Sequence, residues 1–140
     1  MRYAYFCLDL RVKRGQIRQF EADELTRCVD QNEEPDTRLL VNCYQAATGR
    51  FAQETGFDIR TLSDWPTDLV RPFWRKHKGR VRQCDTVVGK VLSFNEISAL
   101  IAVGDKKFRA FNRYKLPIAT DDLVYCHLFG IAEVEKDGSI

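Results

Sequence analysis

Residues 86–113 read TVVGKVLSFNEISALIAVGDKKFRAFNR, and this stretch decides the fold class expected for the second half of the chain. It is rich in β-branched and aromatic residues, and Asn95-Glu96 and Gly104-Asp105-Lys106 divide it where turns are expected. Two further apolar runs follow it on either side of Gly130. Short strands are therefore expected at residues 86–95, 98–103, 107–113, 123–129 and 131–135. Five strands packed so closely favour a small antiparallel β-barrel or a strongly bent sheet.

The first 80 residues predict strands and helices together. Residues 2–12 alternate apolar and polar side chains, which favours a strand, and residues 17–20 are expected to return as its hairpin partner. Apolar residues at helical spacing predict a short helix at 21–30 and the principal helix at about 34–55. The expected class is α+β: an N-terminal lobe over 1–80 and a β-rich lobe over 81–140, which together form one compact unit.

Three stretches of the β-rich lobe carry a family resemblance. Val87-Val88-Gly89-Lys90-Val91, then residues 99–104, then residues 121–125 follow one another as strands do in S1-type and cold-shock-type OB barrels. Residues 84–136 resemble these families, although no F-x-F motif follows Phe94. The resemblance implies an OB-like barrel that binds single-stranded RNA or DNA on one face.

Positive charge is concentrated in the middle of the chain. The net charge of the whole chain is +2, but residues 71–115 contain twelve Lys or Arg against three Asp or Glu. Such asymmetry is a hint of an anionic partner. Residues 71–82, RPFWRKHKGRVR, could neutralise phosphates while an aromatic ring stacks on a base. Alternatively they are a connector with a solvated basic face, in which Phe73 and Trp74 anchor the core.

Alternation along two expected strands defines two further candidate surfaces. Arg109 and Phe111 share a face with other cations, and Tyr125 shares a face with His127 and Phe129. Each face either contacts a polynucleotide or is covered, Phe111 by a neighbouring loop and Tyr125 by the helices. The candidate nucleic-acid-binding residues are Arg71, Trp74, Arg75, Lys76, Lys78, Arg80, Arg82, Lys107, Arg109, Phe111, Arg113 and Tyr125, with Lys106 as a helper.

Catalytic patterns are thin. Cys126 and His127 are adjacent in an expected strand, so their side chains point to opposite faces and cannot form a nucleophile–base pair. Asp9, in an apolar strand context, is similar to the first-strand Asp of metal-dependent nucleases, and this alternative stays open. The chain has no Gly-rich phosphate loop and no G-x-S-x-G motif. Two carboxylate pairs are more typical of solvated surface than of metal sites: Glu133 with Glu135 and Asp64 with Asp68. We expect a protein that is not an enzyme and has no cofactor or metal.

The five cysteines are odd in number and form no C-x-x-C motif, so we expect reduced thiols. No export signal or membrane-spanning stretch is visible, which favours a cytoplasmic protein without membrane contact.

The function expected from the sequence is non-catalytic binding of single-stranded nucleic acid, with RNA and DNA not distinguished. The alternative is a protein-interaction module, an inhibitor or adaptor, that uses the basic face against an acidic partner protein. In that case the acidic residues 30–36 form a second surface of opposite sign.

Overall fold

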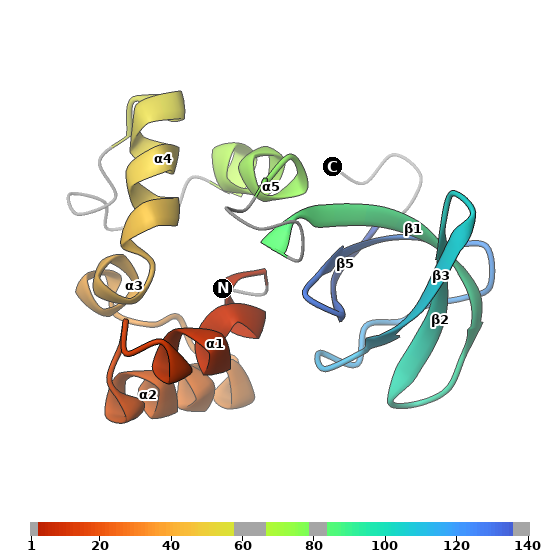
Figure 1. Cartoon of the computed structure of the whole chain (residues 1–140), viewed down its shortest axis with the longest axis horizontal. Coiled ribbons are helices and arrows are strands. Elements are labelled where there is room, and N and C mark those ends of the chain that lie inside the picture. Colours follow the sequence, from red (N-terminus) through yellow and green to blue (C-terminus); the bar gives the residue numbers. More distant parts are fainter. Residues whose placement is uncertain (1–2, 58–66, 79–83, 136–140) are drawn as a thin grey trace. The chain divides into compact units, whose positions relative to one another are not determined.

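The computed structural model describes residues 3–57, 67–78 and 84–135 (Figure 1). Contacts between residues divide the chain into two compact units, of which the first ends at Trp74 and the second begins at Arg75. The first is called the helical unit and the second the barrel unit. Together they confirm the α+β class. None of the helices in the described ranges is long and apolar enough to cross a membrane.

Helices make up the described part of the first unit. They are η1 (Ala4–Cys7), α1 (Leu8–Lys13), α2 (Gln19–Gln31), α3 (Thr37–Cys43), α4 (Gln45–Thr55) and α5 (Thr67–Arg75), whose last residue begins the barrel unit. The Glu21 carboxylate accepts a 2.8 Å hydrogen bond from the Arg18 amide at the start of α2. The Asp36 carboxylate accepts from the Arg38 and Leu39 amides and so caps α3.

The core of the helical unit is built from one face of each of these short helices. Leu25 of α2 is fully buried, and Leu40 and Cys43 of α3 pack in the same cluster. Tyr44, between α3 and α4, is also buried, and its hydroxyl donates a 2.8 Å hydrogen bond to the Ala4 carbonyl. This bond joins residues that are distant in sequence and satisfies the one polar atom of a buried ring.

The expected N-terminal hairpin is wrong, because residues 4–13 are helical. Ala4 and Leu8 are buried while Leu10 is 37% exposed. A spacing of four residues fits both a strand and a helix, so the alternation could not separate them. Residues 17–20 are not a strand either, since α2 begins at Gln19 and the Phe20 ring points to solvent.

The expected helix at 34–55 is two helices. Tyr44 has φ −129° and ψ 45°, which lie outside the helical range and end α3 before α4 begins. Gly56 closes α4 with φ +76°, a left-handed conformation that glycine adopts without strain.

The second unit is a closed five-stranded barrel. Its strands are β1 (Thr86–Phe94), β2 (Ser98–Val103), β3 (Lys106–Phe111), β4 (Leu123–His127) and β5 (Gly130–Glu135). They are ordered β1-β2-β3-β5-β4, and the long β1 pairs with both β2 and β4. Four of the pairings are antiparallel, but β3 and β5 meet in parallel at Phe111 and Gly130. The expectation of a wholly antiparallel barrel is therefore wrong at this one junction.

Small and branched apolar side chains fill the barrel interior. Val91, Ile101, Ala110, Val124 and Ile131 come one from each strand and are all fully buried. Leu116 and Ile118, from the β3–β4 connection, pack against the same cluster. Because side chains alternate along a strand, these inward residues determine which neighbours face outward.

Candidate nucleic-acid interface

The outward-facing side chains of β1, β2 and β3 form ordered rows. Strand register places Lys90, Ala102 and Lys107 in one row, and Ser93, Leu100 and Arg109 in the next. Ser98 and Phe111 are paired one step beyond. Along β3, Lys107, Arg109 and Phe111 are exposed whereas Ala110 is fully buried, as the alternation predicts. We call these eight residues the outer face: Lys90, Ser93, Ser98, Leu100, Ala102, Lys107, Arg109 and Phe111.

Four large apolar side chains are exposed at the Phe111 end of the outer face. Phe94, Ile97, Phe111 and Phe129 are 49%, 69%, 56% and 58% exposed, and we call them the apolar rim. The Asn112 amide donates to the Ile97 carbonyl (2.8 Å) and the Phe111 amide donates to the Phe129 carbonyl (2.7 Å). These bonds bring the end of β3 against both the β1–β2 and the β4–β5 connections. The Phe111 ring is nevertheless 56% exposed, so the expectation that a neighbouring loop covers it is wrong.

The cations of the outer face differ in how firmly they are held. The Arg109 Nη1 atom donates a 3.0 Å hydrogen bond to the Ser98 hydroxyl on the neighbouring strand. Lys90 pairs with Asp121 at 3.5 Å, and both of these side chains are more than half exposed. Such a surface pair contributes at most about 1 kcal/mol, so an incoming phosphate can replace the carboxylate. Arg113 is exposed just beyond β3.

The outward side of β4 and β5 is covered by the barrel unit's own residues. Tyr125 is 8% exposed, and the Arg75 guanidinium carbon lies 4.5 Å from the centre of its ring. An Arg75 Nη2 atom is 2.6 Å from a Glu133 carboxylate oxygen, and both side chains are 14% exposed. Burial raises the pKa of Tyr125, and Arg75 partly opposes that change. The expected roles of Tyr125 as a stacking ring and Arg75 as a phosphate ligand therefore do not fit, because each covers the other.

Two histidines continue this covered side. His127 is fully buried, its Nε2 atom lies 3.0 Å from the Cys84 carbonyl, and its ring centre is 5.7 Å from that of His77. Phe129 does not share this burial. Leu128 and Phe129 both have positive φ angles, so the strand alternation ends at His127. The Phe129 ring is 58% exposed and meets the Phe108 ring edge-on, with ring centres 6.1 Å apart.

The basic segment 71–82 is not one surface. Trp74 stacks on Tyr3 with ring centres 5.8 Å apart and meets Phe73 edge-on, so it is an anchor of the helical unit. Arg71 lies on α5 in the same unit, and its side chain is exposed. Lys76 and Lys78 are exposed in the barrel unit, where Lys78 lies 3.6 Å from Asp85. Arg80 and Arg82 lie outside the described residues.

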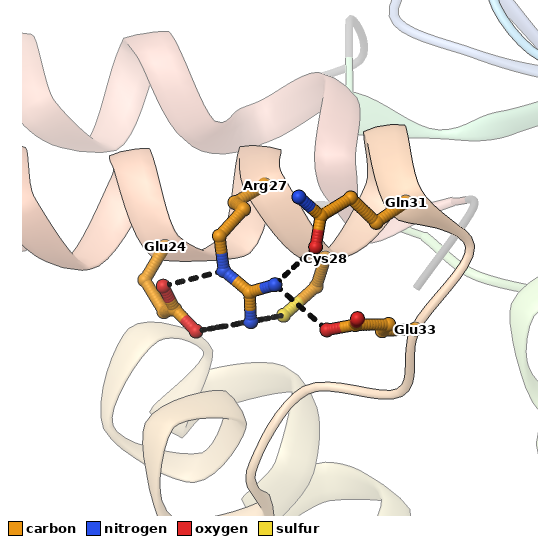
Figure 2. Close-up of polar contacts among 5 residues, drawn as sticks. All are labelled: Glu24, Arg27, Cys28, Gln31 and Glu33. Atoms are coloured by element: carbon orange, nitrogen blue, oxygen red, sulfur yellow. Dashed lines mark hydrogen bonds and ion pairs between the residues drawn. The ribbon is translucent and has the colours of Figure 1, made fainter.

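A polar cluster ties the end of α2 to the residues after it (Figure 2). The Arg27 guanidinium contacts Glu24 and Glu33 at 2.7 Å each and also donates to Gln31. Cys28 beside it is buried, and burial raises the pKa of its thiol. Within the acidic residues 30–36, Glu33 is thus engaged by Arg27 and Asp36 caps α3.

The carboxylates, cysteines and histidines named as catalytic alternatives lie apart in the ranges that the structure describes. No group of three or more His, Cys, Asp or Glu side chains there is placed to hold a metal ion. Asp9 is exposed on α1, so the strand context behind the nuclease alternative is wrong. Cys126 faces the barrel core and burial raises its pKa to about 12, while His127 faces the other side. Asp64 lies outside the described residues.

Several residues of this surface carry weak sequence signals. Ile97 is an isolated apolar residue in a turn between Glu96 and Ser98, and Phe129 directly precedes the Gly130 turn. An apolar side chain in a turn has few ways to be buried, so these two positions were the available sequence signal for the apolar rim. Nothing in the sequence indicates that Ser98 holds Arg109.

Comparisons with known protein families, with curated proteins and with solved structures found no match.

Proposed function

We propose that the barrel unit is an OB-type module that binds single-stranded nucleic acid on its outer face and apolar rim. One observation carries the proposal: the exposed Phe111 ring lies on the same face of β3 as Lys107 and Arg109. A ring that stacks a base and cations that hold phosphates are the two parts of a single-strand binding surface.

The strand order supports this choice of face. An OB barrel is a five-stranded Greek-key barrel that binds oligonucleotides on the β2–β3 face and the β1–β2 and β4–β5 loops. The order β1-β2-β3-β5-β4, with a parallel contact between β3 and β5, suits that arrangement. The apolar rim occupies the same positions: Ile97 in the β1–β2 connection, Phe111 at the end of β3, and Phe129 between β4 and β5.

Energetics favour a ligand with unstacked bases. Stacking of one base on one aromatic side chain contributes about 1–3 kcal/mol, and every base offers a face for it. Bases of a duplex are already stacked on one another and do not offer these faces. Lys90, Lys107, Arg109 and Arg113 add electrostatic attraction along the backbone.

The same apolar rim favours a second candidate, a protein-interaction module. Exposed aromatic rings beside an arginine are typical of protein–protein hot spots, and Lys107 and Arg109 would then face an acidic partner protein. This candidate predicts at most electrostatic affinity for oligonucleotides that does not depend on the Phe111 ring, so a binding experiment with a ring variant separates the two.

The experiment compares two exposed phenylalanines, each close to an arginine. Phe111→Ala removes the ring of the proposed site. Phe20→Ala is the matched control, because Phe20 is 63% exposed in the helical unit and has the Arg18 guanidinium 6.0 Å from its ring centre. Fluorescence anisotropy with a labelled single strand of about 12 nucleotides suits the site size of one OB barrel.

Phe111→Ala is expected to weaken binding roughly 5- to 150-fold, the equivalent of one lost stacking contact, while Phe20→Ala leaves the affinity unchanged. Both rings are exposed, so the far-UV circular dichroism of the two variants should match that of the parent protein. If the parent protein fails to bind single strands at low salt, or if both variants lose affinity equally, the proposal is wrong.

A further inference from the structure

Arg109 is held in a defined position beside Phe111. The Phe111 amide donates to Phe129 rather than to β2, while the next amide, of Asn112, donates back to Ile97. Phe111 and Ser98 are thus a non-hydrogen-bonded pair, the kind in which facing side chains are closest. The Arg109 guanidinium reaches across the strands to the hydroxyl of Ser98, the residue that Phe111 faces in the register.

Most hydrogen-bond donors of the Arg109 guanidinium remain for a ligand. Arginine has five N–H groups in one plane, and Ser98 accepts from one nitrogen only. The anchored cation cannot turn freely, so its remaining donors are directed beside a base stacked on Phe111. A pre-positioned donor pair discriminates between bases better than a mobile side chain does.

The polar side chains of the outer face are mainly hydrogen-bond donors. Its polar members are Lys90, Lys107 and Arg109, which only donate, and the hydroxyls of Ser93 and Ser98. No carboxylate or amide belongs to the eight residues that define it. Beside Phe111, an amino group of adenine or cytosine would meet the donors of Arg109, whereas a base edge with two adjacent acceptors would be matched.

We infer that the outer face selects guanine, with the base stacked on Phe111 and its O6 and N7 atoms accepting from Arg109, which Ser98 positions. The inference rests on the proposed single-strand binding and names the base that this surface prefers. Guanine O6 and N7 form the adjacent acceptor pair to which arginine binds most commonly. Cytosine also presents two adjacent acceptors, O2 and N3, but its single ring covers less of the Phe111 ring than a purine does.

The test uses the full chain and labelled thymidine strands of equal length. One strand is thymidine throughout, and in the others a single central position carries guanine, adenine, cytosine or 7-deazaguanine. The last keeps the purine ring system for stacking but removes the N7 acceptor. Binding constants are measured by anisotropy for the parent protein, Ser98→Ala and Ser98→Thr.

Guanine should bind roughly 5- to 150-fold more tightly than thymidine at the central position, as expected for one bidentate arginine contact. 7-Deazaguanine should lose most of that gain. Ser98→Ala should bring the guanine to 7-deazaguanine affinity ratio toward one while affinity for the thymidine strand is retained. Ser98→Thr keeps a hydroxyl at this position and should keep the ratio.

Two sets of results separate this inference from the proposed function. Binding of every strand with equal affinity, tighter binding of cytosine than of guanine, or equal affinity for guanine and 7-deazaguanine overturns guanine selection and leaves single-strand binding standing. Absence of binding to all strands overturns both. An unchanged ratio in Ser98→Ala removes the positioning role of Ser98.

Discussion

Gly89 of β1 lies close against β2, and replacing it by alanine is a sharp test of the barrel. The residue is buried, pairs with Val124 of β4 and faces the interior between Ile101 and Val103 of β2. A Cβ atom at this position would lie 2.3 Å from Ile101 Cγ2 and 2.9 Å from both Val103 Cγ2 and the Ala102 carbonyl oxygen.

These contacts set the size of the effect. Carbon atoms pack best at about 3.5–4.0 Å, so the new methyl group would overlap Ile101 by more than 1 Å. Ile101 is fully buried and cannot swing outward, and the Ala102 oxygen belongs to the strand backbone. Overpacking of this kind costs about 1–3 kcal/mol, and we place Gly89→Ala near the upper end.

Gly49→Ala is the matched control. Gly49 lies within α4, and an added Cβ atom there would have no other atom within 4 Å. Alanine favours a helix over glycine by about 1 kcal/mol, so this variant should be slightly more stable than the parent.

Amide hydrogen exchange reads the two units separately. Both tryptophans precede Arg75, so tryptophan fluorescence does not report directly on the barrel unit. In Gly89→Ala the slowest amides of β1 and β2 should exchange roughly 150-fold faster, the equivalent of about 3 kcal/mol. In Gly49→Ala they should be unchanged. Equal exchange of these amides in Gly89→Ala and the parent would refute the close contact between β1 and β2.

Two further predictions concern the covered side and the core of the barrel. Glu133→Gln removes the carboxylate paired with Arg75 and should lower barrel stability by about 3 kcal/mol in urea denaturation. Arg75→Met combined with Glu133→Leu should recover most of this loss. A Glu133→Gln variant as stable as the parent protein would contradict the pairing. The pKa of Cys126 is raised from 9.0 to about 12, so the unfolded chain loses this proton first and stability should fall as pH rises above 9, by about 1 kcal/mol at pH 10. Cys126→Ala should be less stable at pH 7 but show a smaller fall between pH 8 and 10, and identical slopes would argue against burial of the thiol.

Local signals predicted the barrel well. Asn95-Glu96 and Gly104-Asp105 divide the apolar runs at the observed turns, and β2 has the expected bounds at Ser98 and Val103. Local turn chemistry and a period of two are enough to place short strands. The order of the strands and the parallel contact of β3 with β5 depend on distant residues and were not predicted from these signals.

The helical unit shows where such signals fail. Ala4 and Leu8 satisfy a strand period and a helix period equally, and packing against Leu25 and Leu40 favours the helix. The apolar stripe of residues 34–55 runs through Tyr44 without interruption. The break there accompanies the hydrogen bond of the Tyr44 hydroxyl to Ala4, a contact between residues 40 positions apart.

The candidate site, too, was predicted only in part from the sequence. Alternation was enough to place Lys107, Arg109 and Phe111 on one outward face. It could not show that Arg75 covers Tyr125, because the two residues are 50 positions apart and the contact depends on the folded barrel. Charge counts alone gave the segment 71–82 more weight than its partly buried, stacked Trp74 and its paired Arg75 support.

The dependence of binding on salt tests single-strand recognition by the outer face most directly. Four cations, Lys90, Lys107, Arg109 and Arg113, are exposed on or next to this face. Neutralising one phosphate each, they predict a slope of about −2.8 for log K against log[salt] with a single strand. Lys107→Gln should reduce the slope by about 0.7, and a duplex of the same length should bind more weakly. Absence of binding at low salt, a slope near zero, or tighter binding of the duplex would contradict single-strand recognition by this face.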